Sequence, residues 1–187
     1  HRGPDGGGTR VDAIAGGSLG FGHRRLAIID LSADAAQPMH SGCGRYTLIY
    51  NGEVYNYREL RVELEQKHQR VFRTSSDTEV ILQALVEWGP AAFGRFNGMW
   101  GIAFLDRQRA ELCLSRDRFG VKPLYLFAEN GRLVFASEIK AVLIGAARKF
   151  AIDVETVYRY LAYNSLDAAP GTFFKGITKL PQGHYQI

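Results

Sequence analysis

The sequence predicts an α+β fold built from antiparallel sheets, and three observations lead to that prediction. Four strand-like segments (MWGIAFLD, ELCLSRD, KPLYLF and RLVFAS) follow one another after Gly89-Pro90 with only short turns between them, as in an antiparallel meander. Segments with helical periodicity are grouped between and after the strands, which argues against a doubly wound parallel sheet. Hydrophobic residues make up 46% of the 187 residues, enough for a buried core.

The N-terminal part predicts a glycine-rich loop followed by two short strands. Residues 2–20 are typical of a loop that leads into a strand at about residues 18–22. The apolar run RRLAIIDL, residues 24–31, has the composition of a strand that is buried on both faces. The segment YTLIY, residues 46–50, predicts a strand that ends at Asn51-Gly52, a dipeptide typical of type I′ hairpin turns.

Apolar residues at helical spacing predict four helices. The second helix has a start signal, because Ser76 and Glu79 form a capping box in which each side chain reaches the other's backbone N–H. The tail after the last helix predicts one more loop and strand. The expected helices cover about residues 55–68, 77–88 and 138–144 and a segment that begins at Asp153.

Composition and charge exclude several classes of function. Lys and Arg number 23 against 19 Asp and Glu, but the basic residues are scattered, so no nucleic-acid partner is expected. The sequence has no apolar run long enough to span a membrane. It also lacks a Walker A motif, a G-x-G-x-x-G turn and histidines at metal-ligand spacing, so neither a nucleotide nor a metal is expected to bind here. Cys43 and Cys113 are far apart, which favours a reducing, cytoplasmic location.

Three short polar segments lie where strands or helices are expected to begin or end. They are Arg24-Arg25, Asn51-Gly52-Glu53 and Ser76-Asp77. Each has an ordinary structural explanation: a surface ion pair, a hairpin turn and a carboxylate that complements a helix dipole.

Together the same segments could form a pocket for a free amino acid. A guanidinium such as that of Arg25 binds an α-carboxylate bidentately, and a carboxylate such as that of Asp77 holds an α-ammonium group. Asn51 and the Gly52 N–H could donate to a carbonyl oxygen that is becoming an oxyanion. Such a pocket would suit amide hydrolysis, although that chemistry also requires a nucleophile.

Several sequence blocks in fixed order cover nearly the whole chain, and together they resemble one family. These blocks are HRGPD, GHRRLAIIDLS with QPM after it, YNGEVYNYREL, SSDTEVIL, FNGMWGIAFLD, SRDRFGVKPLYL and ASEIKAVL. They resemble the glutaminase domain of glutamine-hydrolysing asparagine synthetases, which are class II amidotransferases. The resemblance implies an N-terminal-nucleophile hydrolase fold, a four-layer α/β/β/α sandwich of two antiparallel sheets.

The resemblance also implies roles for individual residues. Arg25 is expected to bind the glutamine α-carboxylate, with the backbone of Ile28 and Ile29 beside it. Glu53 and Asp77 are expected to lie at the substrate amino group.

In the same family pattern, Asn51 and Gly52 form the oxyanion hole, and Arg2 and Asp5 are scaffold residues of the site. The segment from Ser115 to Tyr125 is expected to be structural. The nucleophile in this family is an N-terminal cysteine upstream of HRGPD, so Cys43 and Cys113 are expected to be incidental thiols and the present chain to be inactive.

The implied domain organisation is a type 2 glutamine amidotransferase domain over residues 1–150, without its nucleophile segment. Residues 151–187 would complete it and begin a linker to a synthetase domain of the same polypeptide. The implied substrate is L-glutamine, whose ammonia would amidate aspartate or a related carboxylate, with ATP and Mg²⁺ bound in the synthetase domain and no cofactor in this one. A homodimer is left open.

Two alternatives to that function remain. One is a non-catalytic regulatory or docking domain of the same fold. The other is a glutaminase of another class II branch, one that acts on sugar phosphates or phosphoribosyl substrates. The KPLY and ASEIKAVL blocks argue against this second alternative.

Overall fold

The structure is a computed structural model that describes residues 3–165 and 171–187. Its residues fall into two compact units, which are described separately below. The first comprises His1–Ser115 with Tyr185–Ile187, and the second comprises Arg116–His184.

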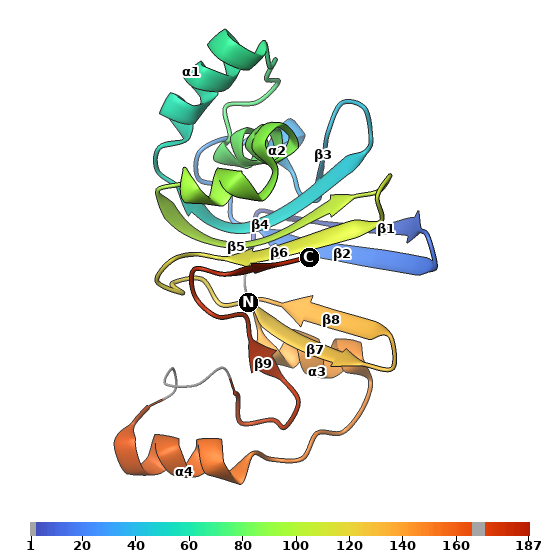
Figure 1. Cartoon of the computed structure of the whole chain (residues 1–187), viewed down its shortest axis with the longest axis vertical. Helices are drawn as coiled ribbons and strands as arrows, with labels where there is room; N and C mark the ends of the chain where they lie inside the picture. The colour runs from blue at the N-terminus through green and yellow to red at the C-terminus, as the bar shows by residue number, and fades with distance from the viewer. Residues whose placement is uncertain (1–2, 166–170) are drawn as a thin grey trace. The chain divides into compact units, whose positions relative to one another are not determined.

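A five-stranded antiparallel sheet forms the centre of the first unit (Figure 1), with strand order β10-β6-β5-β4-β3. The strands are β3 (Met39–His40), β4 (Tyr46–Val54), β5 (Gly98–Asp106), β6 (Glu111–Arg116) and β10 (Tyr185–Gln186). Between β4 and β5 the chain forms helix α1 (Tyr57–His68), helix α2 (Asp77–Trp88) and the 3-10 segment η2 (Gly89–Gly94).

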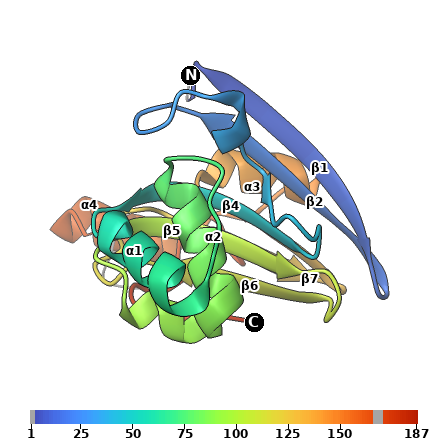
Figure 2. The same ribbon diagram turned by 90° about the horizontal axis from the view of Figure 1, so that it is seen from above.

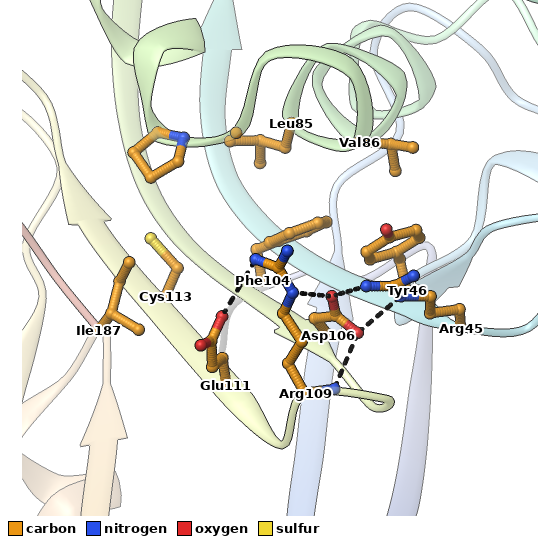
Figure 3. Close-up of a pocket in the computed structure, with 12 residues that line it drawn as sticks. Arg45, Tyr46, Leu85, Val86, Phe104, Asp106, Arg109, Glu111, Cys113 and Ile187 are labelled. Atoms are coloured by element: carbon orange, nitrogen blue, oxygen red, sulfur yellow. Dashed lines mark hydrogen bonds and ion pairs between the residues drawn. The ribbon is translucent and has the colours of Figure 1, made fainter.

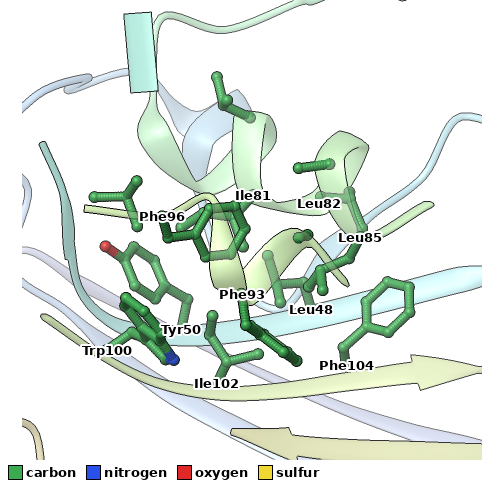
Figure 4. Close-up of a cluster of buried hydrophobic side chains, with 14 of the residues drawn as sticks. Leu48, Tyr50, Ile81, Leu82, Leu85, Phe93, Phe96, Trp100, Ile102 and Phe104 are labelled. Atoms are coloured by element: carbon green, nitrogen blue, oxygen red, sulfur yellow. The ribbon is translucent and has the colours of Figure 1, made fainter. Parts of the chain in front are cut away.

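The main core lies between this sheet and α2 (Figure 4). Three aromatic rings at its centre, those of Phe93, Phe96 and Trp100, meet at centroid distances of 5.7–6.4 Å. The Trp100 indole N–H donates to Ser115 Oγ at 3.1 Å, so its polar atom is satisfied inside the core. This packing holds the start of α2 against the middle of β4.

The first correction concerns residues 2–20, most of which are not a loop. Residues Gly6–Ile14 form strand β1, which pairs residue by residue with β2 (Gly17–Arg25) in a two-stranded antiparallel ribbon (Figure 2). The structure gives a reason for glycine at Gly8, because a Cβ there would overlap the Gln37 carbonyl oxygen. The glycine at this position therefore permits close approach of the ribbon to its neighbour.

The second correction concerns residues 24–31, which do not form a buried strand. Arg24 and Arg25 end β2, and Leu26, Ile28 and Leu31 are 61–77% exposed. Hydrogen bonds from side chains, described below, satisfy backbone groups of this loop in place of a strand ladder.

The third correction concerns Asn51-Gly52, which is not a turn. Both residues lie within β4, opposite Gly101 and Trp100 of β5. A Cβ at Gly52 would lie 2.8 Å from Trp100 Cα and would overlap the Met99 carbonyl oxygen. Glycine is therefore required by the closeness of two strands and not by turn geometry.

The predicted helices are confirmed, and the capping box is confirmed only in its first half. Ser76 caps α2 by accepting from the Glu79 backbone N–H at 3.3 Å. The Glu79 carboxylate has no described hydrogen bond with the Ser76 backbone N–H. It accepts from the backbone N–H groups of Arg73 and Thr74 and from the Thr74 hydroxyl, at 2.7–3.1 Å.

The second unit contains a three-stranded antiparallel sheet with strand order β8-β7-β9. Strands β7 (Tyr125–Glu129), β8 (Arg132–Ala136) and β9 (Thr178–Lys179) pack with helix α3 (Ile139–Ala146) around Phe127 and Val142. Helix α4 (Val154–Tyr163) begins after Asp153, as predicted, with the Asp153 carboxylate accepting from Thr156 N at 2.9 Å. The four predicted strands thus exist but fall into two sheets, so they do not form one meander.

Candidate functional site

Asp77 is a buried carboxylate at the first position of α2. Its Oδ2 accepts from the Tyr50 hydroxyl at 2.9 Å and from Val54 N at 3.2 Å. Burial raises the pKa of the Asp77 carboxyl above its ordinary value, and the nearby charge of Glu53 adds to this effect, while the hydrogen bonds oppose it. Burial and the Asp77 charge also raise the pKa of Tyr50, so the phenol stays a donor. Such a buried carboxylate would gain from a cationic partner.

Arg25, the last residue of β2, faces the loop of residues 26–32. Its Nη1 donates to the Ser32 carbonyl oxygen at 2.7 Å, and its Nη2 donates to that of Asp30. A guanidinium has five N–H donors, so these two bonds leave capacity to grip a carboxylate. The loop therefore sets the direction of the guanidinium.

Asp30 connects this loop to the start of α2, a role that the sequence did not indicate. Its Oδ2 accepts from Ser75 N at 2.8 Å and from Ser75 Oγ at 3.0 Å, and its Oδ1 accepts from Ser32 N at 2.8 Å. Hydrogen bonds from Ser32 and Ser75 hold the pKa of the Asp30 carboxyl well below its ordinary value. Ser75 is two residues before Asp77, so the chain brings the Arg25 loop and the buried carboxylate together. Asp30 lies in the IIDLS segment and Ser75 in the SSD segment, but no local sequence pattern links these two residues.

Other predicted site residues lie on the same elements. Ile28 is 70% exposed and Ile29 is half-buried, both in the Arg25 loop. Asp5 also contacts this loop, since its Oδ2 accepts from Ala27 N at 2.9 Å and its own N–H donates to the Arg25 carbonyl at 3.1 Å. Arg2 lies outside the described residues.

Asn51, Gly52 and Glu53 are consecutive half-buried residues of β4. They follow Tyr50 directly, and Tyr50 is the residue whose hydroxyl reaches Asp77. Val54, which directly follows Glu53, also donates to Asp77, so the residues on both sides of the NGE segment are bonded to this carboxylate. The catalytic and binding roles of all these residues stay predictions.

A cavity of about 270 Å³ lies at the first residue of β4, where Tyr46 pairs with Asp106. Figure 3 shows the side chains that line this cavity. An ion pair between Arg45 and Asp106 forms part of its rim. None of the predicted glutamine-site residues described above lines it. Besides Arg45, Tyr46 and Asp106, the lining consists of Leu85, Val86, Gly89, Pro90, Phe104, Arg109, Glu111, Cys113 and Ile187.

The two cysteines are both unbonded thiols with different surroundings. Cys113 lines the cavity and is buried, which raises its pKa to about 11, and no histidine lines that cavity. It is therefore a protonated thiol at neutral pH. Cys43 is exposed near Ser41, whose hydrogen bond lowers the pKa of the Cys43 thiol. Neither thiol has a described contact with Asn51, Gly52 or Asp77.

The described residues contain neither a metal-binding cluster nor a membrane-spanning helix. Within residues 3–165 and 171–187, no three His, Cys, Asp or Glu side chains come together as a metal site would require. Over the same described ranges, no helix has the length and apolar character needed to cross a bilayer.

Comparison with known proteins places the chain in a family. The family model described as a glutamine amidotransferase domain matches residues 1–187. A putative glutamine-hydrolysing asparagine synthetase of Mycobacterium tuberculosis (strain H37Rv) is 39% identical in an alignment 192 residues long, which covers 98% of this chain and 29% of that protein. Asparagine synthetase 3 of Bacillus subtilis is 39% identical over 169 residues, covering 88% of this chain and 27% of that protein. The chain thus spans only about three-tenths of these relatives.

A solved structure supports the fold. Glutamine phosphoribosylpyrophosphate amidotransferase from B. subtilis, complexed with ADP and GMP, superposes with a TM-score of 0.56. The match has 26% sequence identity and covers 67% of this chain and 29% of that one. The predicted fold class, an α+β N-terminal-nucleophile hydrolase fold with antiparallel sheets, is confirmed. The chain is therefore a glutamine amidotransferase domain, a member of the family to which the glutaminase parts of asparagine synthetases belong.

Proposed function

We propose that this domain hydrolyses the side-chain amide of L-glutamine to glutamate and ammonia. The main support is the link from Arg25 through Asp30 to Ser75, two residues before the buried carboxylate of Asp77. This link brings one cation and one anion together on adjoining segments. A free α-amino acid carries the complementary pair of charges.

In this proposal the Arg25 guanidinium binds the α-carboxylate of glutamine, beside the backbone of Ile28 and Ile29. Asp77 and Glu53 hold the α-ammonium group. The substrate cation would then offset the cost that burial imposes on the Asp77 carboxylate.

Asn51 and the Gly52 N–H act in the reaction itself. A thiolate attacks the side-chain carbonyl carbon, and the two donors stabilise the oxygen that becomes negative. When the C–N bond breaks, the leaving nitrogen takes up the proton that the thiol gave to its base and departs as ammonia. Water then hydrolyses the thioester, which releases glutamate and regenerates the thiol. Oxyanion donors contribute about 10²–10³ in kcat in well-studied hydrolases.

The nucleophile is a thiol from outside these 187 residues. Cys113 is a buried thiol with a raised pKa and Cys43 is an exposed side chain, and neither carries the free α-amine that an N-terminal cysteine uses as its base. We therefore propose that the 187-residue polypeptide by itself does not hydrolyse glutamine.

We further propose that the ammonia is used by an ATP- and Mg²⁺-dependent synthetase domain of the same polypeptide, which amidates aspartate or a related carboxylate. The support is that the relatives carry asparagine synthetase names and that this chain covers only 27–29% of their length. The glutaminase domain takes no cofactor of its own in this proposal.

The test compares Arg25→Ala with Arg24→Ala in the complete protein that contains this domain. Arg25→Ala removes the carboxylate partner and should weaken glutamine binding by about 1.5–3 kcal/mol, the scale of a charge-assisted hydrogen bond. Arg24, next to it in β2, is exposed and has no assigned role, so its alanine variant should keep the original KM. Glutamate release is measured against glutamine concentration.

Equal KM for both variants would contradict the assignment of Arg25. A complete protein that releases no glutamate from glutamine would favour the alternative function, a non-catalytic regulatory or docking domain.

A further inference from the structure

The side-chain amide of Gln37 takes the place of a neighbouring strand beside Tyr50. Its Oε1 accepts from Tyr50 N at 2.6 Å, and its Nε2 donates to the Tyr50 carbonyl oxygen at 3.1 Å. Both bonds are buried. This two-point pairing is the pattern by which one strand residue bonds its partner in an antiparallel ladder. One side chain therefore bonds both backbone polar groups of Tyr50.

A second side chain holds the same carbonyl group. His23 Nε2 lies 3.2 Å from the Tyr50 oxygen, and since a carbonyl only accepts, Nε2 carries the hydrogen. Burial is the main cause that lowers the pKa of His23, so the ring is neutral at neutral pH. The carbonyl carbon held by these two donors is bonded directly to the nitrogen of Asn51. The two bonds therefore set the plane of the peptide that carries Asn51.

We propose that Gln37 is a positioning residue for glutamine hydrolysis, holding the Tyr50–Asn51 peptide so that Asn51 points at the developing oxyanion, with His23 as a second support. This inference rests on the proposed function, because the oxyanion role of Asn51 is part of it. Oxyanion donors must lie within hydrogen-bond distance of the reacting oxygen, and a displacement of about 1 Å can cost about 10²-fold in rate. Arg25 is held by the loop of residues 26–32 and Asp77 is held by its position in α2, so ground-state binding of glutamine should change little.

The experiment measures glutaminase kcat and KM separately in the complete protein. Gln37→Met keeps the length of the side chain and removes both hydrogen bonds, so kcat should fall about 10–100-fold while KM stays within about threefold. The matched control is Gln83→Met on α2, a half-buried glutamine outside the proposed site, which should leave both constants unchanged.

A third variant separates positioning from packing. Gln37→Glu keeps an acceptor for Tyr50 N but turns the donor into a carboxylate oxygen that repels the Tyr50 carbonyl. When pH falls and this buried carboxyl takes up a proton, it can donate again, because burial raises the pKa of carboxyl groups. The kcat of Gln37→Glu, relative to the unmodified protein at the same pH, should therefore recover as pH falls.

Three results would overturn the inference: an unchanged kcat in Gln37→Met, a loss no larger than that of Gln83→Met, or a Gln37→Glu protein without recovery at low pH. If Gln37→Met does not fold, His23→Ala decides. A fall in kcat of about 3–10-fold at constant KM supports the proposal, and an unchanged kcat overturns it. Absence of glutamate release by the unmodified protein, measured first, would overturn the proposed function and this inference with it.

Discussion

The Asp77 carboxylate lowers the stability of the unliganded domain and, in the proposed function, favours binding of the substrate. It is 6% exposed, and its only described side-chain donor is the uncharged Tyr50 hydroxyl. Its pKa is raised in the folded state, so the folded domain prefers the protonated form. The contribution of Asp77 to stability is therefore greatest below the unfolded-state pKa and is lost as pH rises through the folded-state pKa.

Asp77→Asn should consequently stabilise the domain at pH 7 while raising the KM for glutamine. The amide oxygen of the substituted side chain can still accept from Tyr50 and Val54, but the buried charge is gone. Its melting temperature should exceed that of the unmodified protein at pH 7, and the difference should shrink as pH falls toward 3.8, the ordinary pKa of Asp. Thermal unfolding at several pH values and glutamine kinetics provide the measurements.

The contrary finding would be an Asp77→Asn protein that melts at a lower temperature at pH 7. The carboxylate would then be stabilised by its helix-terminal position more than it is penalised by burial.

At the scale of elements, the pairing of β4 with β5 determines where the NGE segment lies. Gly52 on β4 and Gly98 on β5 each face the backbone of the other strand so closely that a Cβ would lie 2.8 Å from a Cα opposite. The two strands can approach in this way only where side chains are absent.

Gly52→Ala should therefore destabilise the domain by about 3 kcal/mol or more, since neither backbone can move away without loss of ladder hydrogen bonds. Gly20→Ala on β2 is the matched control, because a Cβ there has no atom within 4 Å and should change stability little. Chemical denaturation of both variants provides the comparison. Equal stability would mean that β4 and β5 separate easily and that glycine is not needed at this position.

At the scale of the whole molecule, the proposed glutamine site and the thiols are separate features. Cys113 lines the cavity at the Tyr46 end of β4, whereas the NGE segment lies toward the other end of the same strand. The 187-residue polypeptide should therefore release no glutamate above background, and Cys43→Ser should make no difference.

A coupled glutamate assay on this polypeptide and on the complete protein checks the prediction about the nucleophile. Glutamate release by the 187-residue polypeptide that disappears in Cys43→Ser would contradict it, because an exposed thiol with a lowered pKa would then be the nucleophile.

Much of the secondary structure could be predicted from local sequence. Helices α1 and α2, the Ser76 cap and strands β5–β8 follow from apolar spacing and capping residues, which act within a few positions of the chain. The same local signals failed at Asn51-Gly52. An Asn-Gly pair suits a hairpin turn equally well, and only the backbone of β5 on the other side makes it part of a strand.

The sequence by itself determined the family, the fold class and which residues to examine, because those depend on local patterns and on blocks in fixed order. Only the tertiary structure decided how these residues are held. Asp30 bonds Ser75 across 45 positions and Gln37 bonds Tyr50 across 13, and neither pair has a periodicity or motif that links its members. The physical reason is that a polar side chain is satisfied by whichever partner the folded chain brings within hydrogen-bond distance, and packing of the core determines that distance.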